Sequence, residues 1–136
     1  NRKLAAAAKK AGVTDGEDFR TFQNEGYKGL YGGLSAGMIR RHRTLEETAN
    51  ILDYMGSTEL AANLFRATQT EEKLRREEVH SKELAMRLHH RVGARVRQAM
   101  SEISGIMPEQ LPAVENINEV RKRLKRMQQA EELRVM

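Results

Sequence analysis

The four histidines of this 136-residue chain are the side chains best suited to proton transfer or metal binding near neutral pH. No two of them stand four residues apart, the spacing that presents two imidazoles to one metal ion from a helix, and no HExxH sequence occurs. His89 and His90 are adjacent, so at most one of them can face a protein interior from a helix. The chain has no cysteine, which excludes thiol nucleophiles, disulfides and thiolate metal sites. We therefore expect no metal site and no cofactor.

Other catalytic groups have no recognisable signature. No GxSxG or comparable sequence marks a nucleophile. The carboxylates of Glu71, Glu72, Glu77 and Glu78 lie in a segment rich in Lys and Arg, which indicates ion pairs rather than an acid-base couple. We expect no catalytic residue, no small-molecule substrate and no enzymatic activity.

A row of polar side chains within residues 53–74 is the first candidate for binding a partner. Helical periodicity places Leu60, Leu64, Ala67 and Leu74 on one side, with Phe65 beside them. The opposite side carries a line of polar residues that we expect to be exposed: Glu59, Asn63, Arg66, Thr70 and Lys73. The mixture of charge, amide and hydroxyl on this line predicts a partner-binding surface, although a packed helix without any site is the alternative interpretation.

Glu71 breaks this pattern because it falls in the apolar half of the same helix. An unpaired carboxylate there would be costly, so we expect a Lys or Arg of another helix to pair with it. Candidates to meet Glu71 or Glu72, or a phosphate, come from the helix predicted over 81–103: Arg87, Arg91 and Gln98 along one flank of its apolar stripe, and Arg95 at the edge of that flank.

A run of basic side chains near the end of the chain is the second candidate site, and it could bind nucleic acid or another polyanion. It consists of Arg121, Lys122, Arg123, Lys125 and Arg126. Like charges four residues apart repel one another on a helix, by about 0.2 to 0.5 kcal/mol per pair. DNA phosphates, a nucleoprotein filament or an acidic protein surface would relieve that repulsion, whereas a solvated helix would tolerate it. Glu119 is placed to offset Arg123.

The composition predicts an all-α protein with a modest basic excess. Charged residues make up 32% of the chain, aromatic residues 4%, and only two prolines occur. The net charge of +5 permits a polyanionic partner without requiring one. No apolar run approaches the length of a membrane span, so we expect no membrane contact. The absence of cysteine is compatible with the cytoplasm, which is the expected location.

Helix signals divide the chain into an irregular bundle of five or six helices. We expect one helical domain over 1–112 and a basic amphipathic C-terminal helix over 113–136. Around Gly56 the chain should turn between two helices, and a long antiparallel pair should run over 44–79 and 81–103, with Ser81 as the N-cap of its second member. The stretch GYKGLYGGL, residues 26–34, should be an irregular connection whose glycines permit close backbone approach.

Three segments resemble a known bacterial family. They are GYKGLYGGL at 26–34, ILDYMGSTELAANLFRATQTEEKLRR at 51–76 and VRQAMSEISGIMPEQLP at 96–112. The chain from residue 1 to about 112 is similar to the second half of the DNA-damage-inducible protein D family. Because the first residue is Asn and a helix begins at once, we expect a fragment that lacks the family's first half. The basic run at 121–126 lies outside the resemblance.

The resemblance implies a regulatory role under SOS control, in which RecA filaments on single-stranded DNA are the partner and recombinational repair is modulated. The alternative is a DNA-binding regulator of the phage antirepressor type, in which this half serves oligomerisation. A narrow apolar seam in the C-terminal helix, Ile117, Val120, Leu124 and Met127, would suit a homodimer.

Overall fold

The computed structural model describes residues 1–135, with the side chain of residue 117 left aside, and these residues form helices and connections without any strand. The predicted all-α class is therefore confirmed. The α-helices are α1 (Arg2–Lys10), α2 (Gly16–Leu30), α3 (Ala36–His42), α4 (Ser57–Arg76), α5 (Lys82–Ile103) and α6 (Ile117–Val135), and two short 3-10 helices are η1 (Ile51–Tyr54) and η2 (Pro108–Gln110).

Capping residues explain several of the helix limits. Asn1, Asp15, Ser35 and Ser81 each accept a hydrogen bond from the backbone N–H three residues later. After α5 the chain turns at Gly105, whose φ of +75° is a conformation that other residues rarely adopt. The predicted cap at Ser81 and the predicted end of that helix are confirmed.

The glycine-rich stretch is helical where we expected an irregular connection. Gly26 and Gly29 lie within α2, and only the residues after Leu30 form a turn. A Cβ atom on Gly29 would come within 2.1 Å of the backbone oxygen of His90 on α5, and one on Gly93 would come within 2.7 Å of the backbone oxygen of Gly26. The prediction of close backbone approach is therefore confirmed, and this tertiary packing outweighs the weak helix propensity of glycine.

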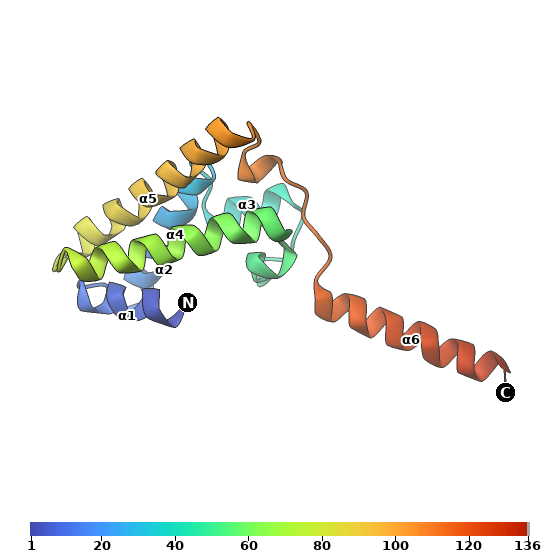
Figure 1. Ribbon diagram of the computed structural model, residues 1–136. Helices are drawn as coiled ribbons and strands as arrows, with labels where there is room; N and C mark the ends of the chain where they lie inside the picture. The colour runs from blue at the N-terminus through green and yellow to red at the C-terminus, as the bar shows by residue number, and fades with distance from the viewer. Residues whose placement is uncertain (136) are drawn as a thin grey trace.

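The long antiparallel pair is shorter at its start than we predicted. Residues 44–50 form turns and coil, Thr44 has φ of +56°, and α4 begins only at Ser57 with Gly56 as its N-cap. The sequence from Thr44 to Glu47 has the form of a capping box, from which we had expected the helix to start at residue 44, but no helix begins there. From the sharp connection at 77–81 the helices α4 and α5 run back beside each other and diverge toward the start of α4 and the end of α5 (Figure 1).

Two clusters of buried side chains make up the core. One joins α1, α2, α4 and α5 around Leu4, Phe22 and Leu74. The other lies at the opposite end, around Leu30, Tyr31, Ile39 and Ile51. Val92 of α5 is half-buried and packs against both clusters, so it connects them.

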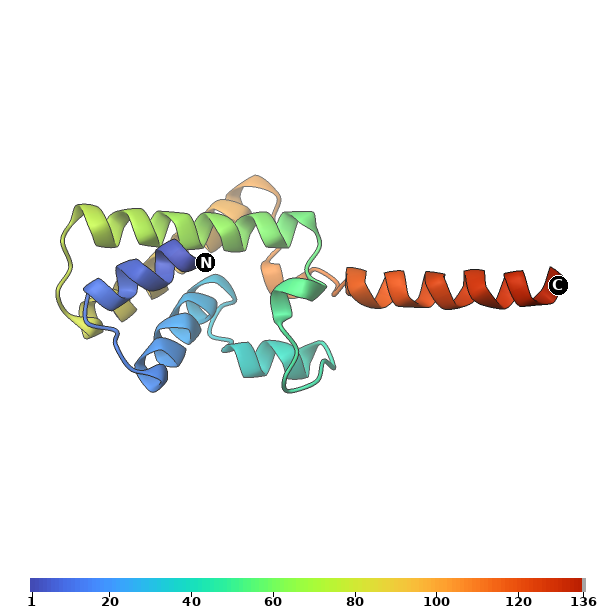
Figure 2. The same ribbon diagram turned by 90° about the horizontal axis from the view of Figure 1, so that it is seen from below.

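The segment between α5 and α6 is fixed to the body by two arginines. Arg97 donates to both carboxylate oxygens of Glu109, at 2.7 and 2.8 Å, and to the carbonyl of Leu30. Arg43 donates to the carbonyls of Pro108 and Leu111. Beyond this segment α6 extends away from the other helices (Figures 1 and 2).

Candidate binding surfaces

The polar line on α4 is buried, which corrects our expectation of an exposed surface. The side chains of Glu59, Asn63, Arg66 and Thr70 are 1%, 2%, 4% and 0% exposed. Lys73 alone among the five is exposed. The face predicted to be apolar is split, because Ala67 and Leu74 are buried whereas Leu64 and Phe65 are about half exposed.

The first reason for this inversion is an ion pair inside the protein. Glu59, at the start of α4, forms an ion pair with Arg43, with 2.7 Å between the charged atoms, and accepts a hydrogen bond from the phenolic O–H of Tyr31. Asn63 donates to the same phenolic oxygen at 3.0 Å and to the backbone oxygen of Glu59. Burial, together with the carboxylate of Glu59, raises the pKa of Tyr31 above its ordinary range. Tyr31 and Arg43, the residues directly after α2 and α3, therefore supply the buried partners of Glu59, although Oε1 of Glu59 makes no hydrogen bond among the described residues.

The second reason is a buried arginine beside a neutral histidine. Arg66 donates to the side-chain oxygen of Asn63 and contacts Nε2 of His89, and its guanidinium lies 5.0 Å from the centre of the Tyr27 ring. Nδ1 of His89 donates to the carbonyl of Phe22 at 2.8 Å, so Nε2 is the acceptor in this arrangement.

Burial and the neighbouring guanidinium determine the ionisation of these two groups. Burial, reinforced by the positive charge of Arg66, lowers the pKa of His89 to about 3, although the hydrogen bond to Phe22 opposes the shift. Burial also lowers the pKa of Arg66 below its ordinary value. With Arg43, Glu59 and Arg66 charged and His89 neutral, this buried polar network carries one excess positive charge that no carboxylate in it balances.

The remaining polar residues of α4 form pairs within the helix. Thr70 donates to the backbone oxygen of Arg66 at 2.7 Å. Glu71 pairs with Arg75 at 3.1 Å, so our expectation of a partner from another helix was wrong. A four-residue spacing on one helix supplies the cation that we had sought on α5.

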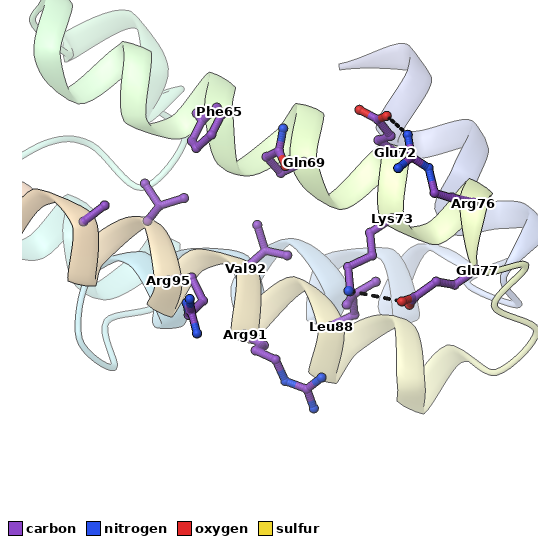
Figure 3. A pocket seen from close by; sticks show the side chains of 12 residues that line it. Phe65, Gln69, Glu72, Lys73, Arg76, Glu77, Leu88, Arg91, Val92 and Arg95 are labelled. Carbon is purple, nitrogen blue, oxygen red and sulfur yellow. Dashed lines mark hydrogen bonds and ion pairs between the residues drawn. The ribbon is translucent and has the colours of Figure 1, made fainter.

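An open groove lies between α4 and α5. It encloses about 850 Å³ and is drawn in Figure 3. Leu88, Val92, Val96 and Ala99 of α5 form one apolar wall, and Phe65 faces them from α4. Phe65 is 55% exposed, which leaves a large aromatic ring open to solvent beside this wall.

Charge is distributed unevenly along the two rims of the groove. On the α4 side, Glu72 pairs with Arg76, and Lys73 pairs with Glu77 at 3.1 Å (Figure 3). On the α5 side, Arg91 and Arg95 are exposed and make no ion pair with any residue that the structure describes. The α4 rim is therefore neutral, whereas the α5 rim carries two uncompensated positive charges.

The basic run lies on α6 and is exposed along its length. Arg123 pairs with Glu115 before the helix, and not with Glu119 as we had expected. Arg121, Lys122, Lys125 and Arg126 make no ion pair within the described residues. These four cations are free to contact an anionic partner.

The apolar seam of α6 can be placed only in part. Leu124 and Met127 are exposed, and Val120 is half-buried. The side chain of Ile117, which we had assigned to the seam, lies outside the described residues, as does residue 136 at the end of the predicted 113–136 helix. Exposed apolar residues on an isolated helix form a surface that could pack against another protein.

Neither a metal cluster nor a membrane span is found along the described chain. No group of three or more His, Asp or Glu side chains in it could hold a metal ion. None of its helices is both long enough and apolar enough to cross a bilayer.

The groove is the feature that our reading of the sequence missed, although part of its signal was present. Arg91 and Arg95 follow each other at helical spacing beside Leu88 and Val92, which is the pattern of an amphipathic helix with a cationic flank. We had expected these arginines to pair with carboxylates of α4 or to contact a phosphate, but Glu71 and Glu72 already pair with Arg75 and Arg76 of their own helix.

Comparison with known proteins gives one family and one curated relative. The profile of the DinD C-terminal domain matches residues 1–120, and so ends just before the basic run. DNA damage-inducible protein D of Escherichia coli strain K12 is 56% identical over 112 residues, which cover 82% of this chain and 41% of the relative. The chain thus spans about two fifths of the length of that relative. No solved structure matches the chain. The chain belongs to the DinD C-terminal domain family.

Proposed function

We propose that the chain is a non-enzymatic regulatory domain of the bacterial DNA damage response that acts on RecA filaments formed on single-stranded DNA. Membership in the DinD C-terminal domain family carries the proposal, because the curated relative is named for induction by DNA damage. The partner is the one implied by the sequence resemblance. The polar network of α4 is internal, so contact with a partner falls to the surfaces of α5 and α6.

The basic run of α6 is the surface that we assign to phosphate contact. Its four uncompensated cations lie on a helix that extends away from the body, where a long polyanion can approach without meeting other elements (Figure 2). Each phosphate contact releases counterions, so binding through this run should weaken as salt rises. The phosphates of single-stranded DNA within the filament would relieve the repulsion along α6.

A salt titration with three nucleic-acid ligands tests the proposal. Binding of the chain to bare duplex, to bare single strand and to RecA-coated single strand would be measured between about 50 and 200 mM salt. We expect the coated strand to bind most tightly. Equal affinity for all three ligands would mean that the chain binds nucleic acid by non-specific electrostatic attraction, and it would contradict a role on the filament.

The double variant Arg121→Glu, Lys122→Glu tests the contact surface. Each new glutamate then has a cation four residues later, Lys125 or Arg126, so the variant strengthens the helix while it removes two phosphate contacts. We expect weaker binding and a log-log salt dependence that is flatter by about 1.4, since each contact to a single strand contributes roughly 0.7.

A matched control applies the same charge change elsewhere. Arg2→Glu, Lys3→Glu places acidic residues in the first exposed turn of α1, where they are favourable to the helix. This control should leave binding and its salt dependence close to those of the original chain. An equal loss in both variants would show that only net charge matters and would rule out α6 as the contact.

A second candidate function is oligomerisation within a DNA-binding regulator of the phage antirepressor type. The exposed Leu124 and Met127 on α6 favour it, because a second copy could cover them. Sedimentation equilibrium decides between the two roles. A concentration-dependent dimer that Leu124→Asp abolishes would support oligomerisation, whereas a strict monomer would exclude it for this half.

A further inference from the structure

We propose that the groove between α4 and α5 is a docking site for an acidic amphipathic helix of a partner protein. This inference goes beyond the action on nucleoprotein filaments, because it concerns a different surface from the basic run of α6. It is independent of whether α6 binds DNA. It assigns the side chains of the groove to protein recognition.

The shape of the groove fits a helix. Two antiparallel helices of 20 and 22 residues form its walls, and it is open along one side. A helix that lies in such a groove presents apolar side chains at three- and four-residue spacing to the wall. Leu88, Val92, Val96 and Ala99 repeat at the same spacing on α5, so successive turns of a docked helix would each meet one of them.

The apolar content of the groove favours protein over nucleic acid. Its wall on α5 is aliphatic, whereas unstacked bases bind to several aromatic platforms in succession. Phe65 is the one aromatic ring along this groove. A half-exposed phenylalanine opposite aliphatic side chains is suited to anchoring an apolar side chain of a partner.

The charges of the rim specify an acidic flank. Arg91 and Arg95 stand four residues apart along the α5 rim and have no carboxylate partner in the described residues. The α4 rim is internally neutralised by the pairs Glu72–Arg76 and Lys73–Glu77. A helix with carboxylates along only one flank would therefore match both rims, with its acidic flank toward α5.

This charge pattern argues against α6 of a second copy as the occupant. The first half of α6 carries five basic residues between 121 and 126, which would meet the arginines of the α5 rim. Like charges brought together in an apolar groove are unfavourable. An acidic helix from a different protein meets the same rim without this repulsion.

The test uses synthetic peptides as probes of the 136-residue chain. The first is a fluorescein-labelled peptide of about five helical turns, with leucines at three- and four-residue spacing and glutamates on one flank. The second has lysine in place of each glutamate, and the third has the composition of the first in shuffled order. Fluorescence anisotropy would measure binding of each peptide to the chain.

Two variants locate the binding. Arg91→Glu, Arg95→Glu should weaken binding of the acidic peptide about tenfold or more and improve binding of the lysine peptide. Ala99→Trp should block the groove, because Ala99 is exposed and a larger side chain there projects into the hollow without disturbing the core. The control is again Arg2→Glu, Lys3→Glu, which changes the charge equally but lies on α1.

The expected result is that the acidic peptide binds better than the other two, and that only the groove variants abolish its binding. The proposal is overturned if the acidic peptide does not bind, if the shuffled peptide binds equally well, or if the α1 control loses as much affinity. It is also overturned if oligothymidine displaces the acidic peptide from the groove, or if Ala99→Trp dissociates a dimer. Each of these results is distinguishable from failure of the α6 contact, which Arg121→Glu, Lys122→Glu tests separately.

Discussion

Acidification should destabilise the chain through His89, the imidazole beside Arg66 at one end of the buried polar network. The folded chain keeps His89 neutral until about pH 3, because burial and Arg66 disfavour its charged form and lower its pKa. In the unfolded chain the same group takes up a proton near its ordinary pKa of 6.5. Between these values the unfolded state binds more protons than the folded state, so stability falls as the pH falls.

The size of the effect follows from the two pKa values. Each pH unit below the unfolded pKa contributes roughly 1.4 kcal/mol, up to the folded pKa. Between about pH 7.5 and pH 5 the loss in the free energy of unfolding should therefore be about 2 kcal/mol. Burial by itself would raise the pKa of Glu109, but the hydrogen bond from Arg97 outweighs burial and lowers that pKa. Protonation of Glu109 therefore falls below this pH window.

Urea denaturation followed by circular dichroism at several pH values measures this loss. The variant His89→Gln retains a hydrogen-bond donor and an acceptor but does not titrate. It should be less stable at neutral pH and should lose much less stability on acidification. The control His80→Gln removes an exposed imidazole and should keep the full pH dependence. Equal pH dependence in the original chain and in His89→Gln would refute the neutral, buried histidine.

Two further perturbations, each with a control, test the packing and the internal polar groups. Gly29→Ala should destabilise the chain by about 1 to 3 kcal/mol despite alanine's better helix propensity, because the added Cβ would overlap the backbone of α5. The control Gly37→Ala in α3 has room for a Cβ and should stabilise the chain by up to about 1 kcal/mol. Thermal melts that rank the two variants in reverse would contradict the close crossing of α2 and α5. Glu59→Gln should cost about 3 to 5 kcal/mol because it leaves Arg43 buried without a counter-charge, as denaturant titration would measure. The control Glu72→Gln breaks an exposed pair of the same helix and should cost at most about 1 kcal/mol, so comparable losses in both variants would place the Glu59 pair outside the core.

The helices themselves could largely be predicted from the sequence, because local signals define most of their limits. The helix α5 begins after its N-cap Ser81 and ends before Gly105. The Ala-rich first residues form α1, which ends shortly before Gly12. The errors arose where tertiary contacts override such signals. Residues 26–30 are helical because α5 packs against their glycines, and residues 44–50 are not helical although they begin with the capping pattern of Thr44 and Glu47.

The orientation of α4 could not be predicted, because the partners of its polar residues are far away in the sequence. Glu59 pairs with Arg43 and accepts from Tyr31, and Arg66 contacts His89, which stands 23 residues later on a different helix. Periodicity assigns a polar line to solvent unless such partners are known. These internal partners account for the burial of the polar line, although Oε1 of Glu59 and Nε of Arg66 make no hydrogen bond among the described residues.

Hydrogen exchange of the chain on RecA-coated single-stranded DNA, compared with the free chain, tests the central claim most directly. That claim is that the filament is contacted from the surface of α6 while the polar residues of α4 remain internal. We expect slower exchange over 119–128 on the filament, and unchanged exchange in α4 around Asn63, where amides are already protected in the free chain. Unchanged exchange along α6, together with new protection confined to residues 59–70, would contradict the account.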